Sequence, residues 1–403
     1  MSHIVVIGAG QAGSSLVSTL RTEGFEGEIT LVGAEPVPPY QRPPLSKAYL
    51  LGEMARERLF LRAPDWWQEN AITLRLGGPA TDLDLAAKTV RVGGEELAYD
   101  QLALATGLAP RKLPADIGGE LDGVYSIRTL EDIDRLEPAL RAASRLLVVG
   151  GGYIGLEAAA AARKLGLSVT LVEAGLRVLG RVAAEETSGY FRALHAEEGV
   201  EILEHAGLER LLGEGRVKGA RLSDGAEIPA DLVVVGIGLM PSAPLAETAG
   251  LEVAGGVLVD AFGRTSDPAV WAAGDCAVLP HDGGRLRLES VQNAIEMAEQ
   301  VARNMLGAET AYVPKPWFWS DQYDVKLQIA GLNTGYDRVV VRDGERARSR
   351  SHWYYAGDRL LAVDAMNDAR AYMVGKRLIE GGRSPDPAKV ADPEADLKSL
   401  LAG

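Results

Sequence analysis

Glycines that recur at one spacing are the residues with the clearest chemistry in this sequence. Two clusters each hold three glycines directly after an apolar run: Gly8, Gly10 and Gly13 after 3–7, and Gly150, Gly152 and Gly155 after 145–149. In such a cluster the first glycine allows a tight turn, the second lets the backbone approach a pyrophosphate, and the third lets a helix pack on a strand. N–H groups at the helix N-terminus attract the phosphates. The sequence therefore predicts two dinucleotide cradles.

An acidic residue completes each of the two patterns. Glu35 follows an apolar run at 29–33, and Glu173 ends the second strand of the later unit. A carboxylate at this position accepts a hydrogen bond from the adenosine ribose, and in the later unit it repels the 2′-phosphate of NADPH. We therefore expect NADH as a cofactor. The alternative is a domain that was duplicated for structural reasons.

Two dinucleotides in one enzyme indicate hydride transfer between them. One is then a bound flavin, FAD, and the other a diffusible nicotinamide. Asp275 ends a buried strand within 265–277, and an acid at the carboxyl end of a strand faces the ligand crevice of an open α/β sheet. The ribityl chain of a flavin offers hydroxyls to this carboxylate. A helix-capping aspartate is the alternative, and the two roles are compatible.

The elements that position these residues differ along the chain. A strand, a helix and a second strand surround each glycine cluster. Strands within 99–111 and 230–242 mark the places where the chain leaves and re-enters its first domain. Residues 337–344 and 350–368 are typical of antiparallel strands with tight turns, and a helix is expected after them.

The composition limits the class of protein and its partners. The 403 residues suffice for two or three domains of roughly 100–200 residues each. The net charge of −14 argues against nucleic acid as a partner. The longest apolar run, Leu232–Met240, is far shorter than the ~20 residues that span a bilayer, so no membrane association is expected. The five histidines lack metal-ligand spacing, and no metal site is expected.

The cysteine content and the first residues indicate the compartment. Cys276 is the single cysteine, so the chain forms neither an internal disulfide nor a cysteine-pair redox centre. The first strand begins at once, without the charged and apolar regions of a secretory signal. We expect a cytoplasmic protein.

Several short stretches together resemble one known family. They are the paired glycine clusters, "RPPLSKAYL" at 42–50, "ATG" at 105–107, "AAGDCA" at 272–277, "ESVQNA" at 289–294 and "PWFWSDQY" at 316–323. The chain resembles, over nearly its whole length, the FAD-dependent NADH:ferredoxin reductases of bacterial P450 and dioxygenase chains, the putidaredoxin reductase-like family. The resemblance implies that NADH reduces FAD, and that FAD reduces a [2Fe-2S] ferredoxin serving a P450 or other oxygenase.

The resemblance also implies the fold. It is α/β, with two Rossmann-like dinucleotide-binding domains in the glutathione reductase-like arrangement and a C-terminal α+β domain. The FAD-binding domain is expected at 1–110 and 241–316, the NAD-binding domain at 111–240, and the C-terminal domain at 317–403. The expected state is a monomer or weak dimer.

The resemblance assigns the cofactor contacts position by position. The expected FAD contacts are Gly8, Gly10, Ala12, Gly13, Glu35, Arg42, Lys47, Ala80, Arg128, Asp275 and Val291. The expected NAD contacts are Gly152, Ile154, Glu157, Glu173 and Arg181. Arg42 is expected near the pyrophosphate, and Trp319 against the flavin ring, where its flat apolar surface excludes water from the hydride path. Trp317 and Phe318 are expected to serve the core.

Lys47 has a specific interpretation beside the flavin. Related flavoenzymes that reduce disulfides or peroxides carry a redox cysteine near this place, whereas this chain has Ser46 and Lys47. A cation beside the ring favours the anionic reduced flavin. We expect Glu157 to pair with Lys47 across the domain interface, and a solvent-facing lysine is the alternative. Lys47, Glu157 and Trp319 are thus the residues expected to take part in the chemistry.

Two other functions remain open at this level. One is a monodehydroascorbate reductase-like or other small-molecule NADH reductase. The other is a redox-sensing interaction flavoprotein of the apoptosis-inducing-factor type, which predicts basic patches that the acidic charge does not support. For a ferredoxin, the sequence predicts a local docking patch of Arg285, Arg287 and Lys315.

Overall fold

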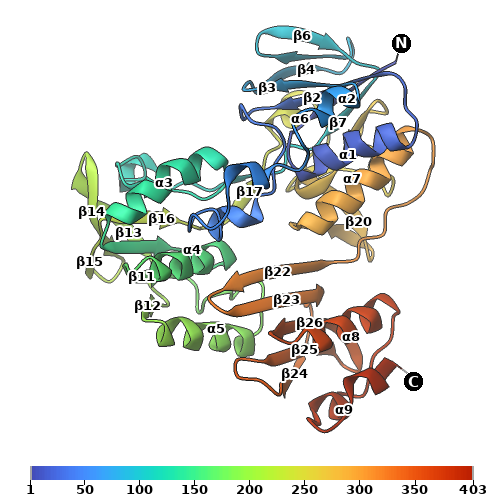
Figure 1. Ribbon diagram of the computed structural model, residues 1–403. Coiled ribbons are helices and arrows are strands. Elements are labelled where there is room, and N and C mark those ends of the chain that lie inside the picture. Colours follow the sequence, from blue (N-terminus) through green and yellow to red (C-terminus); the bar gives the residue numbers. More distant parts are fainter. Residues whose placement is uncertain (1, 402–403) are drawn as a thin grey trace. The chain divides into compact units, whose positions relative to one another are not determined.

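The computed structural model describes residues 2–401 (Figure 1). The chain forms two units. The first unit holds Met1–Arg42, Arg56–Ala109 and Leu239–Pro316. The second unit holds Pro43–Ala55, Pro110–Gly238 and Trp317–Gly403. The segment with Lys47 and the C-terminal region thus belong to the same unit as the second glycine cluster. The division into three domains remains a prediction.

The first unit is built on a parallel sheet that buries both faces. Its strand order is β19 (Val270–Ala272), β7 (Gln101–Leu104), β1 (His3–Ile7), β2 (Glu28–Gly33), β3 (Ile72–Leu76). The inner strands are largely apolar and buried, as expected when helices cover a parallel sheet, whereas the edge strand β3 alternates between buried and exposed residues. Helices α1 (Gln11–Thr22) and α7 (Val291–Met305) pack against each other in this unit.

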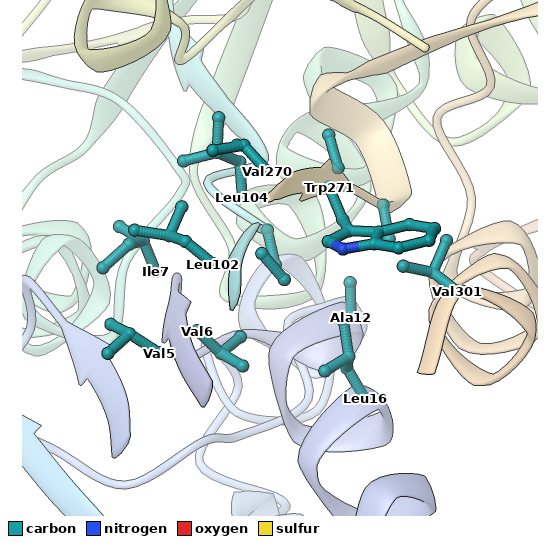
Figure 2. Close-up of a cluster of buried hydrophobic side chains, with 14 of the residues drawn as sticks. Val5, Val6, Ile7, Ala12, Leu16, Leu102, Leu104, Val270, Trp271 and Val301 are labelled. Atoms are coloured by element: carbon teal, nitrogen blue, oxygen red, sulfur yellow. The ribbon is translucent and has the colours of Figure 1, made fainter. Parts of the chain in front are cut away.

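The core of the first unit forms between the sheet and these helices. Figure 2 shows side chains from strands β1, β7 and β19 meeting side chains from α1 and α7, among them Val6, Leu104, Trp271, Leu16 and Val301. Val6, Leu16 and Val301 are fully buried. Burying such a side chain stabilises the fold by roughly 1.5–3 kcal/mol, so this core holds together the strand and the helix that flank the first cradle.

The second unit repeats the same sheet. Its order is β12 (Val200–Leu203), β11 (Ser168–Val172), β10 (Arg145–Val149), β16 (Leu232–Val235), β9 (Val124–Tyr125), and all of its pairs are parallel. Helix α4 (Tyr153–Lys164) follows β10 as α1 follows β1, and its alanines at 158–162 are buried. The small side chains let the helix lie close to the strands. Two Rossmann-like domains are therefore confirmed.

The C-terminal region forms an antiparallel sheet within the second unit. Its order is β22 (Trp317–Gln322), β23 (Val325–Gly331), β26 (Arg359–Met366), β25 (Arg350–Ala356), β24 (Arg338–Asp343). Helix α8 (Ala369–Glu380) packs on it, and the Asp368 side chain caps this helix. The predicted α+β character of this region is confirmed.

Smaller elements complete the two units. The short sheets are β4 (Ala80–Asp84), β5 (Thr89–Val92) and β6 (Glu95–Ala98); β13 (Leu208–Glu214), β14 (Arg216–Leu222) and β15 (Glu227–Pro229); β18 (Val257–Leu258), β20 (Ala277–His281) and β21 (Gly284–Leu286); and β8 (Leu108–Pro110) with β17 (Leu239–Pro241). The other helices are α2 (Trp66–Glu69), α3 (Leu130–Ala142), α5 (Glu185–Glu197), α6 (Pro244–Thr248) and α9 (Pro387–Ala391). None of the helices within residues 2–401 has the length and apolar character to cross a membrane.

A buried polar cluster joins α5 to the C-terminal sheet. The Thr187 hydroxyl donates to Asp364 Oδ2 at 2.7 Å, so it must accept from His352 Nδ1, which lies 2.7 Å away. The Tyr354 hydroxyl donates to the same Asp364 oxygen. His352 therefore carries its proton on Nδ1, and its buried Nε2 has no hydrogen-bond partner among the described residues. Burial lowers the pKa of His352 to about 4 and raises the pKa of Asp364 to about 6.

We predict that His352→Asn makes the protein more resistant to acid. The His352 pKa is lowered in the folded state, so its stabilising effect is present above pH 6.5 and is lost as the pH falls toward 4. This loss amounts to roughly 3 kcal/mol. Asparagine keeps an N–H donor for Thr187 and cannot titrate. The free energy of unfolding, measured between pH 6.5 and 4, should therefore fall less steeply in the variant.

The control exchanges the exposed His205 for asparagine, which suits its left-handed backbone conformation, with φ 57°. His195, whose pKa burial also lowers to about 4, keeps part of the acid dependence in both variants. Asp364 acts in the opposite direction, because its stabilising effect is lost as the pH rises through about 6. An equally steep fall in wild type and His352→Asn would contradict the prediction.

Candidate active site

The outer glycines of both clusters are required by the fold itself. Gly8 has φ 119°, and a Cβ there would lie 2.1 Å from the Ala105 carbonyl oxygen. Gly150 has φ 106°, and its Cβ would lie 2.4 Å from the Gly236 carbonyl oxygen. A Cβ on Gly13 or Gly155 would clash in the same way with the carbonyl of the first glycine of its own cluster. No side chain fits at these distances, so any substitution must displace backbone.

The middle glycines are not required by the fold. Gly10 and Gly152 are the N-caps of α1 and α4, with φ −102° and −79°, which other residues adopt readily. A Cβ added to either one has no atom within 4 Å. Among residues 2–401 no side chain caps either helix, so N–H groups of both first turns are left for a ligand. This arrangement fits a bound pyrophosphate, which needs the space that a Cβ would fill.

The predicted ribose acids have different surroundings in the two cradles. Glu173 accepts the Gly151 N–H at 2.7 Å through Oε2 and the Gly175 N–H at 2.6 Å through Oε1. Its carboxylate therefore holds the glycine loop in place and keeps further lone pairs for a ribose. Glu35 instead accepts from the Tyr40 hydroxyl at 2.6 Å and from Arg42 Nη2 at 2.7 Å. Arg42, predicted near the pyrophosphate, is thus held beside the predicted ribose acid.

Other predicted FAD contacts gather around the first cradle. Asp275 lies in a short turn, Gly274–Cys276, directly after β19, and a Cβ on Gly274 would lie 2.9 Å from the Ala12 side chain. The same position lies 3.7 Å from Ala294 of α7, the helix that begins at Val291. The Ser290 side chain caps α7, so Asp275 does not cap this helix. Ala12, Asp275 and Val291 are therefore brought to one end of the sheet.

The remaining predicted contacts lie elsewhere in the chain. Ala80 begins strand β4 of a separate small sheet in the first unit. Arg128 lies in the second unit just before α3, where its N–H donates to Asp132. Ile154 is the second residue of α4, and an added Cβ on Gly238 would lie 3.7 Å from an Arg181 guanidinium nitrogen. Arg181 thus approaches the segment that follows β16 of the second cradle sheet.

Lys47 and Glu157 form the expected ion pair. Lys47 Nζ lies 3.0 Å from Glu157 Oε1 and 3.8 Å from Asp321, and the Glu157 side chain is only 6% exposed. Ser46 Oγ donates to Glu157 Oε2 at 2.5 Å, and Ser320 Oγ donates to Oε1 at 2.6 Å. The pair lies within the second unit, since the segment of Lys47 belongs to the same unit as α4. Sequence reasoning missed both serines and Asp321.

Strand β22 places its residues on two faces. Alternation along the strand puts Trp317, Trp319 and Asp321 on one face and Phe318 and Ser320 on the other. The rings of Trp317 and Trp319 have centroids 5.5 Å apart. Phe318 packs on Tyr153, the first residue of α4, at 4.9 Å, and the Trp317 side chain packs against the C-terminal core, which agrees with their predicted core role. Trp319 thus shares its face with Asp321, which approaches Lys47.

Two dinucleotide cradles in one chain define a nicotinamide-dependent flavoprotein oxidoreductase. Residues 2–298 match the family described as pyridine nucleotide-disulphide oxidoreductase, and residues 317–401 match the family described as reductase C-terminal. Rhodocoxin reductase of Rhodococcus erythropolis is 43% identical over 403 residues, covering 99% of this chain and 94% of the relative. The chain belongs to the ferredoxin reductases of the pyridine nucleotide-disulphide oxidoreductase family. The predicted family is confirmed.

Solved structures agree with this assignment. A crystal structure of the covalent putidaredoxin reductase–putidaredoxin complex has a TM-score of 0.95 and 40% identity, covering 100% of this chain and 98% of that one. The ferredoxin reductase for the CYP199A2 system from Rhodopseudomonas palustris has a TM-score of 0.95 and 38% identity, covering 99% of each chain.

We predict that alanine at each middle glycine removes one ligand and leaves the fold intact. Gly10→Ala should purify with little FAD, because its Cβ occupies the space of the flavin pyrophosphate. Gly152→Ala should keep FAD and raise the KM for NADH by about tenfold or more. The measurements are the ratio of flavin absorbance to protein absorbance and the initial rate of NADH oxidation.

Each variant is the control for the other. The thermal unfolding midpoints of the flavin-free proteins should agree within about 2 °C. An unfolded Gly10→Ala protein would show that this glycine serves the fold. Loss of FAD in Gly152→Ala alone would reverse the assignment of the two cradles.

Proposed function

We propose that this protein transfers electrons from NADH through FAD to a [2Fe-2S] ferredoxin that serves a P450 or other oxygenase. The observation that carries the proposal is two open dinucleotide cradles in a chain whose single cysteine is fully buried. Burial also raises the pKa of the Cys276 thiol, which disfavours the reactive thiolate. Electrons from NADH must therefore leave for an external acceptor, and the relatives are ferredoxin reductases.

The first cradle is proposed to hold FAD. Gly8, Gly10, Ala12 and Gly13 provide the turn and the helix N-terminus for its pyrophosphate. Asp275 and Val291 lie at the same end of the sheet, where the carboxylate can accept from ribityl hydroxyls. Bound FAD would supply an acceptor that takes two electrons together and releases them one at a time. Glu35, held by Tyr40 and Arg42, remains the proposed ribose contact, and Ala80 and Arg128 remain proposed contacts.

The second cradle is proposed to bind NADH. Gly152 and Ile154 offer the pyrophosphate space and first-turn N–H groups, and Glu173 offers a carboxylate to the ribose. Because Glu173 is fixed at both oxygens by backbone N–H groups, it cannot turn away from a 2′-phosphate. NADH is therefore favoured over NADPH. Arg181 is the proposed cation of this site.

Lys47, Glu157 and Trp319 are proposed to act at the flavin ring. Glu157 keeps Lys47 in position, since it holds the ammonium at 3.0 Å in a mostly buried place. The ammonium then favours reduced flavin electrostatically. Trp319 is proposed to exclude water from the path of the hydride, which requires reacting atoms about 3–3.5 Å apart. A cytoplasmic location is also part of the proposal, supported by the single cysteine.

We predict that Lys47→Met slows flavin reduction by NADH and leaves FAD bound. Methionine keeps the apolar stem and removes the charge, and Glu157 retains its two serine donors. Flavin bleaching in a stopped-flow instrument should slow by about tenfold, and unfolding should become easier by roughly 3 kcal/mol. Lys326→Met, which alters an exposed lysine of the same unit, is the control. An unchanged reduction rate in Lys47→Met would remove Lys47 from the chemistry.

The proposed docking patch tests whether a ferredoxin is the acceptor. The three cations of this patch differ in their contacts. Arg287 pairs with Glu289 at 2.7 Å and donates to the Asp275 carbonyl at 3.3 Å. Reversing the charge of Arg287 would therefore disturb Asp275, a proposed flavin contact. Arg285 on β21 and Lys315 are exposed. Arg285 makes no ion pair within residues 2–401. Arg285 is therefore the informative position.

We predict that Arg285→Glu lowers the kcat/KM for a [2Fe-2S] ferredoxin about fivefold, because a rim charge steers an acidic partner. NADH-driven reduction of ferricyanide, which needs no docking surface, should be unchanged. The loss should shrink as ionic strength rises. Equal losses with both acceptors would mean damaged flavin chemistry. No loss with either would place the ferredoxin elsewhere, and absence of any ferredoxin turnover in wild type would overturn the proposed function.

A further inference from the structure

A chain of hydrogen bonds leads away from Glu157 through the interior of the second unit. Ser320 donates to Glu157 at 2.6 Å, and Gln322 Nε2 donates to Ser320 Oγ at 3.2 Å. His195 Nε2 lies 2.8 Å from Gln322 Oε1, and the Tyr323 hydroxyl lies 3.3 Å from His195 Nδ1. Ser320 and Gln322 come from β22, which packs against α4, and His195 comes from α5.

The direction of every proton in this chain follows from the charge on Glu157. The 3.0 Å contact with Lys47 requires a carboxylate, so the Ser320 hydroxyl must donate to it. Ser320 then accepts from Gln322, which turns the amide oxygen toward His195. An amide oxygen only accepts, so His195 carries its proton on Nε2 and accepts from Tyr323 through Nδ1.

All donors therefore point toward Glu157. Such head-to-tail hydrogen bonds polarise one another and strengthen the last bond, here the one to the carboxylate. Turning over Gln322 or changing the tautomer of His195 would place two donors or two acceptors against each other. Both residues lie in the fully buried interior, where no solvent can replace a lost partner.

The local environment of each link maintains this direction. Burial lowers the pKa of His195 to about 4, so the ring is neutral near neutral pH and can pass on one hydrogen bond. Burial raises the pKa of Tyr323, which keeps its hydroxyl a donor. The charged groups nearest this end are Glu198, which raises the pKa of both His195 and Tyr323, and Arg163, which lowers that of Tyr323. At the other end Lys47 and Asp321 face Glu157.

Two features of the fold show that the chain is specific. Ser320 and Gln322 occupy the buried face of β22, where an apolar residue would need no partner. Tyr323 has φ 57° in the turn after β22, a conformation that costs a tyrosine about 1 kcal/mol or more. Glycine or asparagine would fit the turn better. Both features are explained if the polar groups and the tyrosine hydroxyl are needed for the chain.

We infer that Tyr323, His195, Gln322 and Ser320 form a one-way hydrogen-bond chain that fixes the carboxylate of Glu157 in place, and that His195 and Gln322 are thereby positioning residues for Lys47. The inference rests on the proposed function for its effect on flavin reduction. It does not rest on that function for its effect on Glu157 itself. The two effects can therefore be measured separately.

The test compares substitutions that break a link with substitutions that keep it. His195→Leu and Gln322→Leu remove two hydrogen bonds each, whereas His195→Gln keeps an Nε2–H donor near the same place. Tyr323→Phe removes the last hydroxyl alone. Tyr190→Phe is the matched control, since it removes a hydroxyl that binds Arg348 and lies outside the chain. FAD content and the unfolding midpoint are measured for each holoenzyme.

The first readout is the hydrogen bonding of the Glu157 carboxylate. Infrared spectra should show a shifted carboxylate stretching band in His195→Leu and Gln322→Leu and an unshifted band in His195→Gln, each compared with wild type. The band is assigned to Glu157 by its loss when Glu157→Gln is added. An unshifted band in both leucine variants would overturn the inference.

The second readout is the rate of flavin reduction by NADH. Both leucine variants should lose about fivefold in rate, Tyr323→Phe less, and His195→Gln and Tyr190→Phe nothing beyond wild type. An equal loss in His195→Leu and His195→Gln, or a loss that comes with lost FAD or a lower midpoint, would show a structural role alone and overturn the inference. A shifted carboxylate band without a change in rate would uphold the chain and would contradict the proposed role of Lys47.

Discussion

A buried carboxylate needs compensation, and in this protein that need joins three distant segments. Glu157 lies in the second turn of α4. Its partners come from the segment Pro43–Ala55 and from β22. An unpaired buried charge would cost several kcal/mol, and the loss of one partner alone costs roughly 3–5 kcal/mol. The pairing therefore explains why the proline-rich segment and the C-terminal sheet belong to the unit of the second cradle.

The two cradles share backbone geometry and differ in the side chains that hold it. Both begin with a glycine of positive φ that approaches a carbonyl at the end of a neighbouring strand. In the second cradle Glu173 binds the loop directly, whereas in the first Glu35 is occupied by Tyr40 and Arg42. A loop held by its own acid is suited to a ligand that comes and goes.

Helix α5 meets the C-terminal sheet through two buried histidines. His352 is hydrogen-bonded to Thr187 in the cluster with Asp364. His195 is hydrogen-bonded to Gln322 in the chain of hydrogen bonds that ends at Glu157. In both cases burial makes the neutral ring the stable form, so each histidine serves as a fixed donor and acceptor at neutral pH. Polar contacts of this kind have one correct geometry, unlike apolar contacts. They therefore define how the antiparallel sheet packs on helix α5.

The local backbone features of this protein were determined by its sequence alone. The spacing of Gly8, Gly10 and Gly13 and its repeat at 150–155 predict strand, turn and helix correctly, because close approach between neighbouring segments depends on which residues lack a Cβ. The pair of Lys47 and Glu157 was also predicted, through the resemblance of "RPPLSKAYL" to known reductases.

Only the tertiary structure decided the partners of these residues. Ser320 and Gln322 are ordinary polar residues in a strand, and His195 lies in a helix more than a hundred residues before them. Nothing in their spacing indicates a common chain, because hydrogen bonds between sequence-distant side chains depend on how the elements pack. The same reason made Glu173 a ligand of its own glycine loop and placed Arg42 on Glu35. Spacing determines the backbone, and packing determines which charges meet.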